Sequence, residues 1–273
     1  MPNESTAVSS AHIAAIKSSH DAAVLSSQVA ALFPAGVVAA ELLGTGDPAL
    51  LHPGEARECR DFGARRVADF TAGRLCARRA LSELGFAEFA LHRERDLRPS
   101  WPESIVGSIS HTDGFCAAVV AKRGALRSLG FDAEQLGRAG QDLWELLFTP
   151  TEMARLYSLA PGERTKAASI AHSAKEAYYK CQFDVTGAWL DFTDVEIEFD
   201  GALSGQGAFR VMPGRRTPPL PPGAVRGRYA LAGTVVLTGL AMLDPALLDL
   251  AKITQNVAAP VQVTDPSGLV QRH

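Results

Sequence analysis

Two short segments contain the residues whose types and spacing best suit chemistry. In the first, apolar residues alternate with Asp132 and Glu134 over positions 129–134, which is the period of two that a strand imposes. The two carboxylates therefore share one face of the strand, about 6–7 Å apart at a rise of about 3.3 Å per residue. That separation lets their oxygens converge on one hard cation, or flank it with a water.

The second segment, residues 173–180, is helical in character and carries Lys175, Glu176 and Lys180. Glu176 and Lys180 lie one turn apart, so a carboxylate is placed between two ammonium groups. Three carboxylates with two lysines suit Mg²⁺ and phosphate better than zinc, which prefers His and Cys clusters. Taken singly, each segment is also what a solvated strand end or a surface ion pair looks like.

In their order and spacing, the two segments resemble the signature motifs of the 4'-phosphopantetheinyl transferases. These are a Gly-apolar-Asp-x-Glu strand and an aromatic-x-x-Lys-Glu-(Ala/Ser)-x-x-Lys helix. The resemblance is to the long, single-chain (Sfp-type) members related to enterobactin synthetase component D, and it spans about residues 57–242. It is also carried by an Arg-rich segment at 65–74, Trp101-Pro102, the Gly-Ser-Ile-Ser-His run at 107–111, and residues 188–192.

Two positions depart from the family pattern. Phe131 fills the slot before Asp132, where Ile or Val is commoner, and it keeps the apolar character of that slot. His172 fills the aromatic slot three residues before Lys175, which changes the packing expected of that helix. Neither departure touches an acidic or basic position.

The resemblance implies transfer of the 4'-phosphopantetheine arm of coenzyme A to a serine of an apo acyl, peptidyl or aryl carrier protein. Adenosine 3',5'-bisphosphate is the product released. Mg²⁺, with Mn²⁺ as an alternative ion, would be held by Asp132, Glu134 and Glu176. Glu176 would act either as the third ligand or as the general base. Lys180 would stabilise charge on the pyrophosphate, and Lys175 would supply a second phosphate contact.

Four further residues are candidates for binding coenzyme A. Arg66 and Arg74 are eight positions apart on a predicted helix, hence about 80° apart around it and about 12 Å along it, so both can face one anionic ligand. By resemblance, these arginines and the pair Ser110-His111 contact its phosphates. The alternatives are a solvated basic helix and a structural histidine. Another phosphate-binding cation is expected among three arginines whose register stays open: Arg93, Arg95 and Arg98.

Composition indicates a soluble enzyme. The chain has 273 residues, 47% of them hydrophobic, and a net charge of -3, which argues against a general nucleic-acid binder. Its four cysteines show neither zinc nor disulfide spacing, and no segment reads as a signal peptide or a membrane span. We therefore expect a cytoplasmic monomer that contacts neither membrane nor nucleic acid.

The patterning predicts an α+β fold. In the first half, a long helix is expected at 55–84 with Gly85 as its stop, then strands at 105–111 and 115–122 joined by a tight turn, and a third strand carrying Asp132. In the second half, helices are expected at 143–159 and 163–183, a Pro-rich loop at 213–222, and strands at 192–199, 209–212, 226–232 and 235–242. The resemblance adds two similar halves related by a pseudo-twofold, with the active site at their junction. The expected division is an N-terminal arm (1–25), two halves (26–135 and 136–245) and a C-terminal extension (246–273).

Two other functional classes stay open. A Mg²⁺-dependent phosphodiesterase acting on a nucleotide diphosphate would share the carboxylates but need no protein acceptor. A non-catalytic module would bind coenzyme A or carrier protein without transfer, although clustered charges such as Asp132, Glu134, Glu176 and Lys180 are costly to retain without use. Incubation with coenzyme A, Mg²⁺ and an apo carrier protein separates the three classes by the mass of the acceptor.

Overall fold

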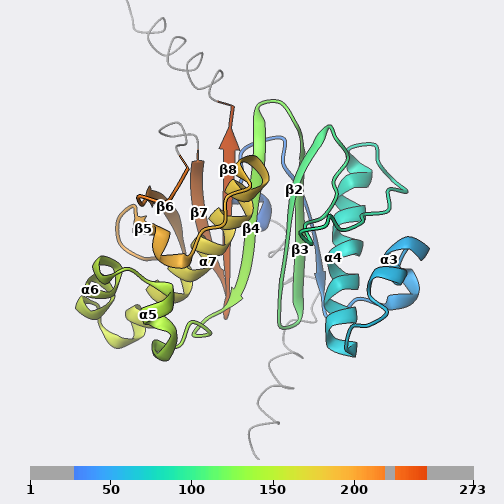
Figure 1. Cartoon of the computed structure of the whole chain (residues 1–273). Helices are drawn as coiled ribbons and strands as arrows, with labels where there is room; N and C mark the ends of the chain where they lie inside the picture. Colours follow the sequence, from blue (N-terminus) through green and yellow to red (C-terminus); the bar gives the residue numbers. More distant parts are fainter. Residues whose placement is uncertain (1–27, 219–224, 245–273) are drawn as a thin grey trace, which may run out of the picture.

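A computed structural model describes residues 28–218 and 225–244 of the chain. Within these residues, helices and two antiparallel sheets alternate, which confirms the predicted α+β class (Figure 1). The predicted N-terminal arm, the end of the Pro-rich loop and the C-terminal extension lie outside the described residues.

The first sheet has three strands in the order β1-β3-β2. The predicted hairpin is confirmed: β2 (Ile105–Thr112) pairs antiparallel with β3 (Phe115–Lys122). Gly114 takes a φ of 72° in the two-residue turn, a conformation that suits glycine. The sequence reading missed β1 (Val38–Leu43), because its run Val-Ala-Ala-Glu-Leu-Leu lacks a clear alternation of apolar and polar residues.

One long helix was expected over residues 55–84, and this was wrong in one respect. The chain instead forms α3 (Pro53–Glu58) and α4 (Ala64–Glu83), with a short 3-10 helix η1 (Pro48–Leu50) before them. Gly63 has an extended backbone and stands as the N-cap of α4, so the helical path is broken there. The predicted stop is confirmed, since Gly85 follows α4 with a φ of 96°. Figure 1 shows α4 covering the three-stranded sheet, with α3 beside it.

The second sheet has five strands in the order β4-β8-β7-β6-β5. Its strands are β4 (Leu126–Gln135), β5 (Val195–Phe199), β6 (Gln206–Pro213), β7 (Val225–Ala232) and β8 (Val235–Leu243). The strands predicted for the second half are thus found, with β5 beginning after a 3-10 turn, η3 (Phe192–Asp194). β4 pairs with β8, so the boundary between the two sheets lies between Lys122 and Leu126.

The long helix α7 (Pro161–Thr186) covers one face of this sheet (Figure 1). It ends at Gly187, whose φ of 64° is left-handed. The helix predicted at 143–159 is interrupted, because Phe148 is extended and Thr149 caps a new helix. This region consists of η2 (Gln141–Leu143), α5 (Trp144–Leu147) and α6 (Pro150–Ser158).

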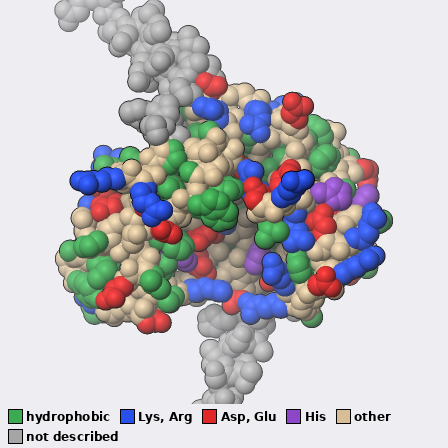
Figure 2. All heavy atoms as spheres, in the orientation of Figure 1, with side chains coloured by type: hydrophobic (Ala, Val, Ile, Leu, Met, Phe, Trp, Pro, Cys, Tyr) green, Lys and Arg blue, Asp and Glu red, His purple; other side chains and the backbone are tan. Residues whose placement is uncertain are grey.

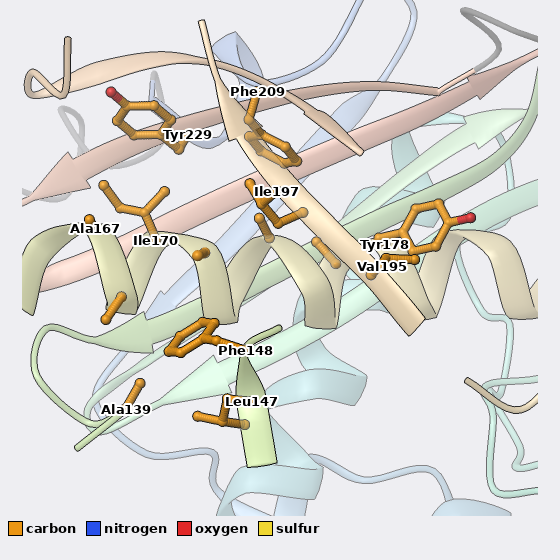
Figure 3. Close-up of a cluster of buried hydrophobic side chains, with 14 of the residues drawn as sticks. Ala139, Leu147, Phe148, Ala167, Ile170, Tyr178, Val195, Ile197, Phe209 and Tyr229 are labelled. Carbon is orange, nitrogen blue, oxygen red and sulfur yellow. The ribbon is translucent and has the colours of Figure 1, made fainter. Parts of the chain in front are cut away.

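The largest buried cluster lies between α7 and the five-stranded sheet (Figure 3). Ile170 of α7 faces Ile197 of β5, Tyr178 of α7 lies beside Val195 of the same strand, and Phe209 and Tyr229 complete the sheet side. The helix approaches β4 so closely that a Cβ added at Gly130 would overlap the carbonyl oxygen of Ala177. The glycine of the first motif therefore sets the distance between the strand and the helix that carry the predicted acidic residues.

The two sheets also meet, through strands β2 and β4. The hydroxyl of Ser108 on β2 accepts a hydrogen bond from the backbone N–H of Phe131 on β4 at 3.0 Å. None of the helices in the described part of the chain has the length and apolar character needed to cross a bilayer.

Candidate active site

The carboxylate of Asp132 is the centre of a buried polar cluster. Its Oδ1 accepts hydrogen bonds from Lys180 Nζ at 2.8 Å and Ser110 Oγ at 2.9 Å, and its Oδ2 accepts one from Ser173 Oγ at 2.8 Å. Burial alone would raise the pKa of Asp132, but the Lys180 ammonium and these hydroxyls hold it below its usual value. Asp132 is therefore ionised and fixed in position between β2, β4 and α7.

Glu134 lies two residues along the same strand and is only half-buried. Its Oε1 accepts a hydrogen bond from the backbone N–H of Gln135 at 3.0 Å. His172 Nδ1 lies 3.9 Å from Glu134 Oε2, and this nitrogen is buried without a hydrogen-bond partner. Burial raises the pKa of Glu134, and the neighbouring charge of Asp132 raises it further.

Glu176 lines a hollow of about 240 Å³ with a largely aromatic wall. Tyr179 and Trp189, which is 73% exposed, stand beside it with their ring centroids 6.0 Å apart. Burial raises the pKa of Glu176; Lys180 opposes this shift, and Asp132 adds to it. The hollow therefore combines an apolar surface with a carboxylate that holds its proton more readily than a solvated one.

A second hollow, of about 430 Å³, is lined by basic and aromatic side chains from α4, β2 and the loop before β2. Arg66 stacks on Phe62 with 4.4 Å to the ring centroid, and Arg74 stacks on Phe70 at 4.1 Å. The Arg74 side chain is buried and its Nε has no hydrogen-bond partner. Burial lowers the pKa of Arg74 to about 10, so it remains charged at neutral pH. Arg93, His111 and one carboxylate, Asp69, also line the hollow, and its three arginines outnumber that acid, so its chemistry favours an anionic ligand.

These features share one face of the molecule. Figure 2 shows this face hollowed between its two parts, with acidic side chains toward the part that contains α7 and basic side chains toward the part that contains α4. Ser110 and His111 connect the parts, because they are neighbours on β2. Ser110 bonds to Asp132, and His111 lines the basic hollow.

The acidic residues fit a hard cation by their chemistry. Across residues 28–218 and 225–244, no group of three or more His, Cys, Asp or Glu side chains is already placed to enclose an ion. However, Asp132, Glu134 and Glu176 are close enough that the charge of Asp132 raises the pKa of both glutamates. A divalent cation with oxygen ligands relieves such repulsion, so this set fits Mg²⁺.

Comparison with known proteins places the same residues in one family. The family of 4'-phosphopantetheinyl transferase N-terminal domains matches residues 55–121, and the 4'-phosphopantetheinyl transferase superfamily matches residues 128–217. The 4'-phosphopantetheinyl transferase Svp of Streptomyces mobaraensis is 33% identical over 174 residues, which are 63% of this chain and 71% of Svp. This chain belongs to the 4'-phosphopantetheinyl transferase superfamily.

Other members of the superfamily align over similar regions. The 4'-phosphopantetheinyl transferase PptT of Mycobacterium tuberculosis is 34% identical over 175 residues, covering 62% of this chain and 76% of PptT. Enterobactin synthase component D of Escherichia coli is 31% identical over 125 residues, covering 44% of this chain and 57% of that protein. The family resemblance read from the motifs is therefore confirmed.

The structure brings most of the site residues predicted from the sequence together in two groups. Asp132 and Lys180 are in direct contact, with Glu134 and Glu176 around them. Lys180 Nζ also donates to Ser110 Oγ and to the carbonyl of Phe131, so all three of its donors are used within the protein. The second group is the basic hollow, which brings together Arg66, Arg74 and His111.

One predicted phosphate contact, Lys175, is corrected by the structure. Lys175 is 2% exposed, and its Nζ donates to Glu152 Oε2 at 2.6 Å and to the carbonyls of Leu147 and Phe192. Its three donors are thus used in the core, where it joins α7 to α6 and η3. The hydroxyl of Ser110 faces Asp132 and not the basic hollow, because successive side chains of a strand point to opposite faces.

Some residues of the site were not identified from the sequence. Arg93 lines the basic hollow, whereas Arg95 does not and Arg98 pairs with Asp96 and Asp184. Among these three neighbours, only the folded loop reveals which one faces the hollow. Ser173, which bonds to Asp132, directly precedes the Ala-Lys-Glu run, and this position in the second motif was the available signal.

Proposed function

We propose that this chain transfers the 4'-phosphopantetheine arm of coenzyme A to a serine hydroxyl of an apo carrier protein, and releases adenosine 3',5'-bisphosphate. Family membership supports the reaction type. The observation that carries the proposal is the adjacency of Ser110 and His111 on β2, because it joins a buried acidic centre to a basic anion site.

Coenzyme A has the parts that this arrangement would bind. The basic hollow offers Arg66, Arg74, Arg93 and His111 to the phosphates at the nucleotide end. The aromatic hollow beside Glu176 then suits the pantetheine arm, whose amide and methylene groups match an apolar wall.

The acidic residues support the transfer step. Asp132, Glu134 and Glu176 would hold Mg²⁺, which when bound neutralises charge on the pyrophosphate. Glu176 is the candidate base for the serine proton, since it lies in the aromatic hollow and burial raises its pKa. The serine oxygen would attack the phosphorus that bears the pantetheine arm, and the bond to the adenosine bisphosphate leaving group would break. Lys180, whose ammonium lies 2.8 Å from Asp132, would keep that carboxylate ionised.

The test is incubation of the chain with coenzyme A, Mg²⁺ and a panel of apo acyl, peptidyl and aryl carrier proteins. Transfer adds the mass of the phosphopantetheine arm to the carrier and leaves adenosine 3',5'-bisphosphate in solution. Release of free 4'-phosphopantetheine with unmodified carrier would instead indicate a phosphodiesterase. Tight coenzyme A binding without either product would indicate a binding module.

A further inference from the structure

The short helix α3 holds the loop that carries Arg93. Glu58 Oε2 accepts a hydrogen bond from Arg93 Nε at 3.1 Å, and the backbone carbonyl of Glu58 accepts one from Arg93 Nη2 at 2.8 Å. One turn earlier, the buried Glu55 accepts a hydrogen bond from the backbone N–H of Leu91 at 2.9 Å. Helix and loop are packed together, because a Cβ at Gly54 would collide with the ring of His92.

These contacts occupy one edge of the Arg93 guanidinium and leave the other edge open. A guanidinium has five N–H donors, and the two bonds to Glu58 use the Nε donor and one donor on Nη2. Among the described residues no acceptor is found for Nη1, and the group lines the basic hollow. Its plane is also supported by the ring of Phe62, 5.0 Å away, and by that of Phe70, 5.8 Å away. The free edge therefore keeps a fixed fork of donors, which suits bidentate binding of phosphate.

We infer that Glu58 is a positioning residue of the coenzyme A site: it orients the Arg93 guanidinium so that its free edge meets a phosphate. This rests on the proposed function, which assigns the basic hollow to the phosphates of coenzyme A. No ligand contact is assigned to Glu58 itself, since it acts through Arg93.

Glu58 also carries a negative charge, which would repel the same phosphate. Burial opposes its ionisation, but hydrogen bonds from His92 and Arg93 hold the pKa of Glu58 below the usual value, so it is charged at neutral pH. The positioning of Arg93 by Glu58 should therefore strengthen coenzyme A binding, whereas the charge of Glu58 should weaken it. The Glu58 carboxylate lies on the far side of the guanidinium from the hollow and is partly exposed, so solvent screens its repulsion of the phosphate. The Arg93 donors would contact the phosphate directly, so their orientation should have the larger effect on binding.

Two mild substitutions of the full chain separate the two effects. Glu58→Asp keeps the charge but withdraws the carboxylate from Arg93 Nε, while Glu58→Gln keeps an acceptor in place and removes the charge. If Glu58 positions Arg93, Glu58→Asp should weaken coenzyme A binding about five- to tenfold in calorimetry, and Glu58→Gln should change it less than about twofold. If repulsion dominates, Glu58→Gln tightens binding and Glu58→Asp leaves it unchanged, which would overturn the inference.

A double-mutant cycle with Arg93 tests whether Glu58 acts through it. In an Arg93→Ala background, adding Glu58→Asp should cause no further loss of coenzyme A affinity, whereas an equal loss in both backgrounds would overturn the inference. Glu83→Asp, at the exposed C-terminal end of α4, is the matched control and should leave affinity unchanged. Failure of the unsubstituted chain to bind coenzyme A would refute the proposed function; binding that is insensitive to Glu58→Asp would refute only the positioning role.

Discussion

Lys180 Nζ lies 2.8 Å from Asp132 Oδ1, and this pair joins the helix of the second motif to the strand of the first. The Asp132 side chain is 7% exposed and the Lys180 side chain 29%. Because Ser110 and Ser173 also donate to the carboxylate, removal of the lysine leaves a buried charge with hydroxyl partners only. We therefore expect loss of this pair to lower both the stability of the fold and the activity of the proposed site.

Lys180→Met should destabilise the fold by about 3–5 kcal/mol and change its dependence on pH. In the native protein the pKa of Asp132 is below the unfolded value of 3.8, so its stabilisation is complete above about pH 4 and is lost as pH falls through the lower, folded pKa. Without the ammonium, burial raises that pKa above the unfolded value, so the sign of this contribution reverses and the variant should gain stability as pH falls through the raised pKa. Urea unfolding from pH 3 to 8 measures this, with Lys122→Met at the exposed end of β3 as the control. Parallel pH profiles for the two proteins would contradict the prediction.

Glu176→Gln should lower kcat at least about a hundredfold while leaving coenzyme A affinity within about threefold, because the amide keeps the shape but cannot take the serine proton. Rates of carrier modification and calorimetry give the two quantities. Glu163→Gln, in the exposed first turn of the same helix, is the matched control. Near-normal turnover by the Glu176 variant at ordinary Mg²⁺ would remove Glu176 from the chemistry.

Asp132→Asn and Glu134→Gln should each abolish detectable transfer, since each removes an anionic oxygen from the proposed Mg²⁺ site. Asp132→Asn should also lower stability, because it leaves Lys180 without its carboxylate partner. Carrier modification measured across a Mg²⁺ titration, with circular dichroism as the folding check, tests this. Partial recovery at high Mg²⁺ would agree with a weakened metal site. Full activity of either variant at low Mg²⁺ would rule out its role as a ligand.

Lys175→Met should act on stability and not on coenzyme A binding, because the ammonium is bonded to Glu152 and two carbonyls in the core. A loss of about 3–5 kcal/mol is expected when one partner of a buried pair is removed. The double variant Lys175→Met, Glu152→Gln should recover part of this loss, since the uncompensated carboxylate is gone. A tenfold weaker affinity for coenzyme A in a Lys175→Met protein of normal stability would restore the phosphate contact first expected for this residue.

Arg74→Ala and His111→Ala should weaken binding of coenzyme A. Whichever residue meets the 3'-phosphate should show a smaller effect with dephospho-coenzyme A, because the lost interaction exists only when that phosphate is present. An effect of about tenfold is expected for the buried, charged Arg74. Arg79→Ala, exposed on the same helix, provides the comparison. Unchanged coenzyme A affinity in both variants would show that the basic hollow does not bind the phosphates.

The sequence predicts the motif elements well, because their patterns are local. The β2-β3 hairpin, the strand with Asp132 and the helix with Glu176 all follow from alternation, turn residues or helical spacing. The break of the first helix at residues 59–63 was missed, because α3 ends at its C-cap, Cys59, without a glycine or proline stop signal and only the extended backbone of Gly63 marks the start of α4. The partners of Lys175 could not be predicted either, since Glu152 lies 23 residues away and meets it only through packing of α6 on α7.

The adjacency of Ser110 and His111 makes β2 a molecular ruler. Their Cα atoms are one peptide unit, about 3.8 Å, apart and their side chains point to opposite faces of the strand, so the backbone and width of β2 set the spacing between the acidic centre and the basic hollow. β2 is held along its whole length by pairing with β3 and near its middle by the contact of Ser108 with β4, so this spacing is fixed. If the basic hollow binds the phosphates of coenzyme A as proposed, the distance from those phosphates to the acidic centre is therefore set by the backbone of β2.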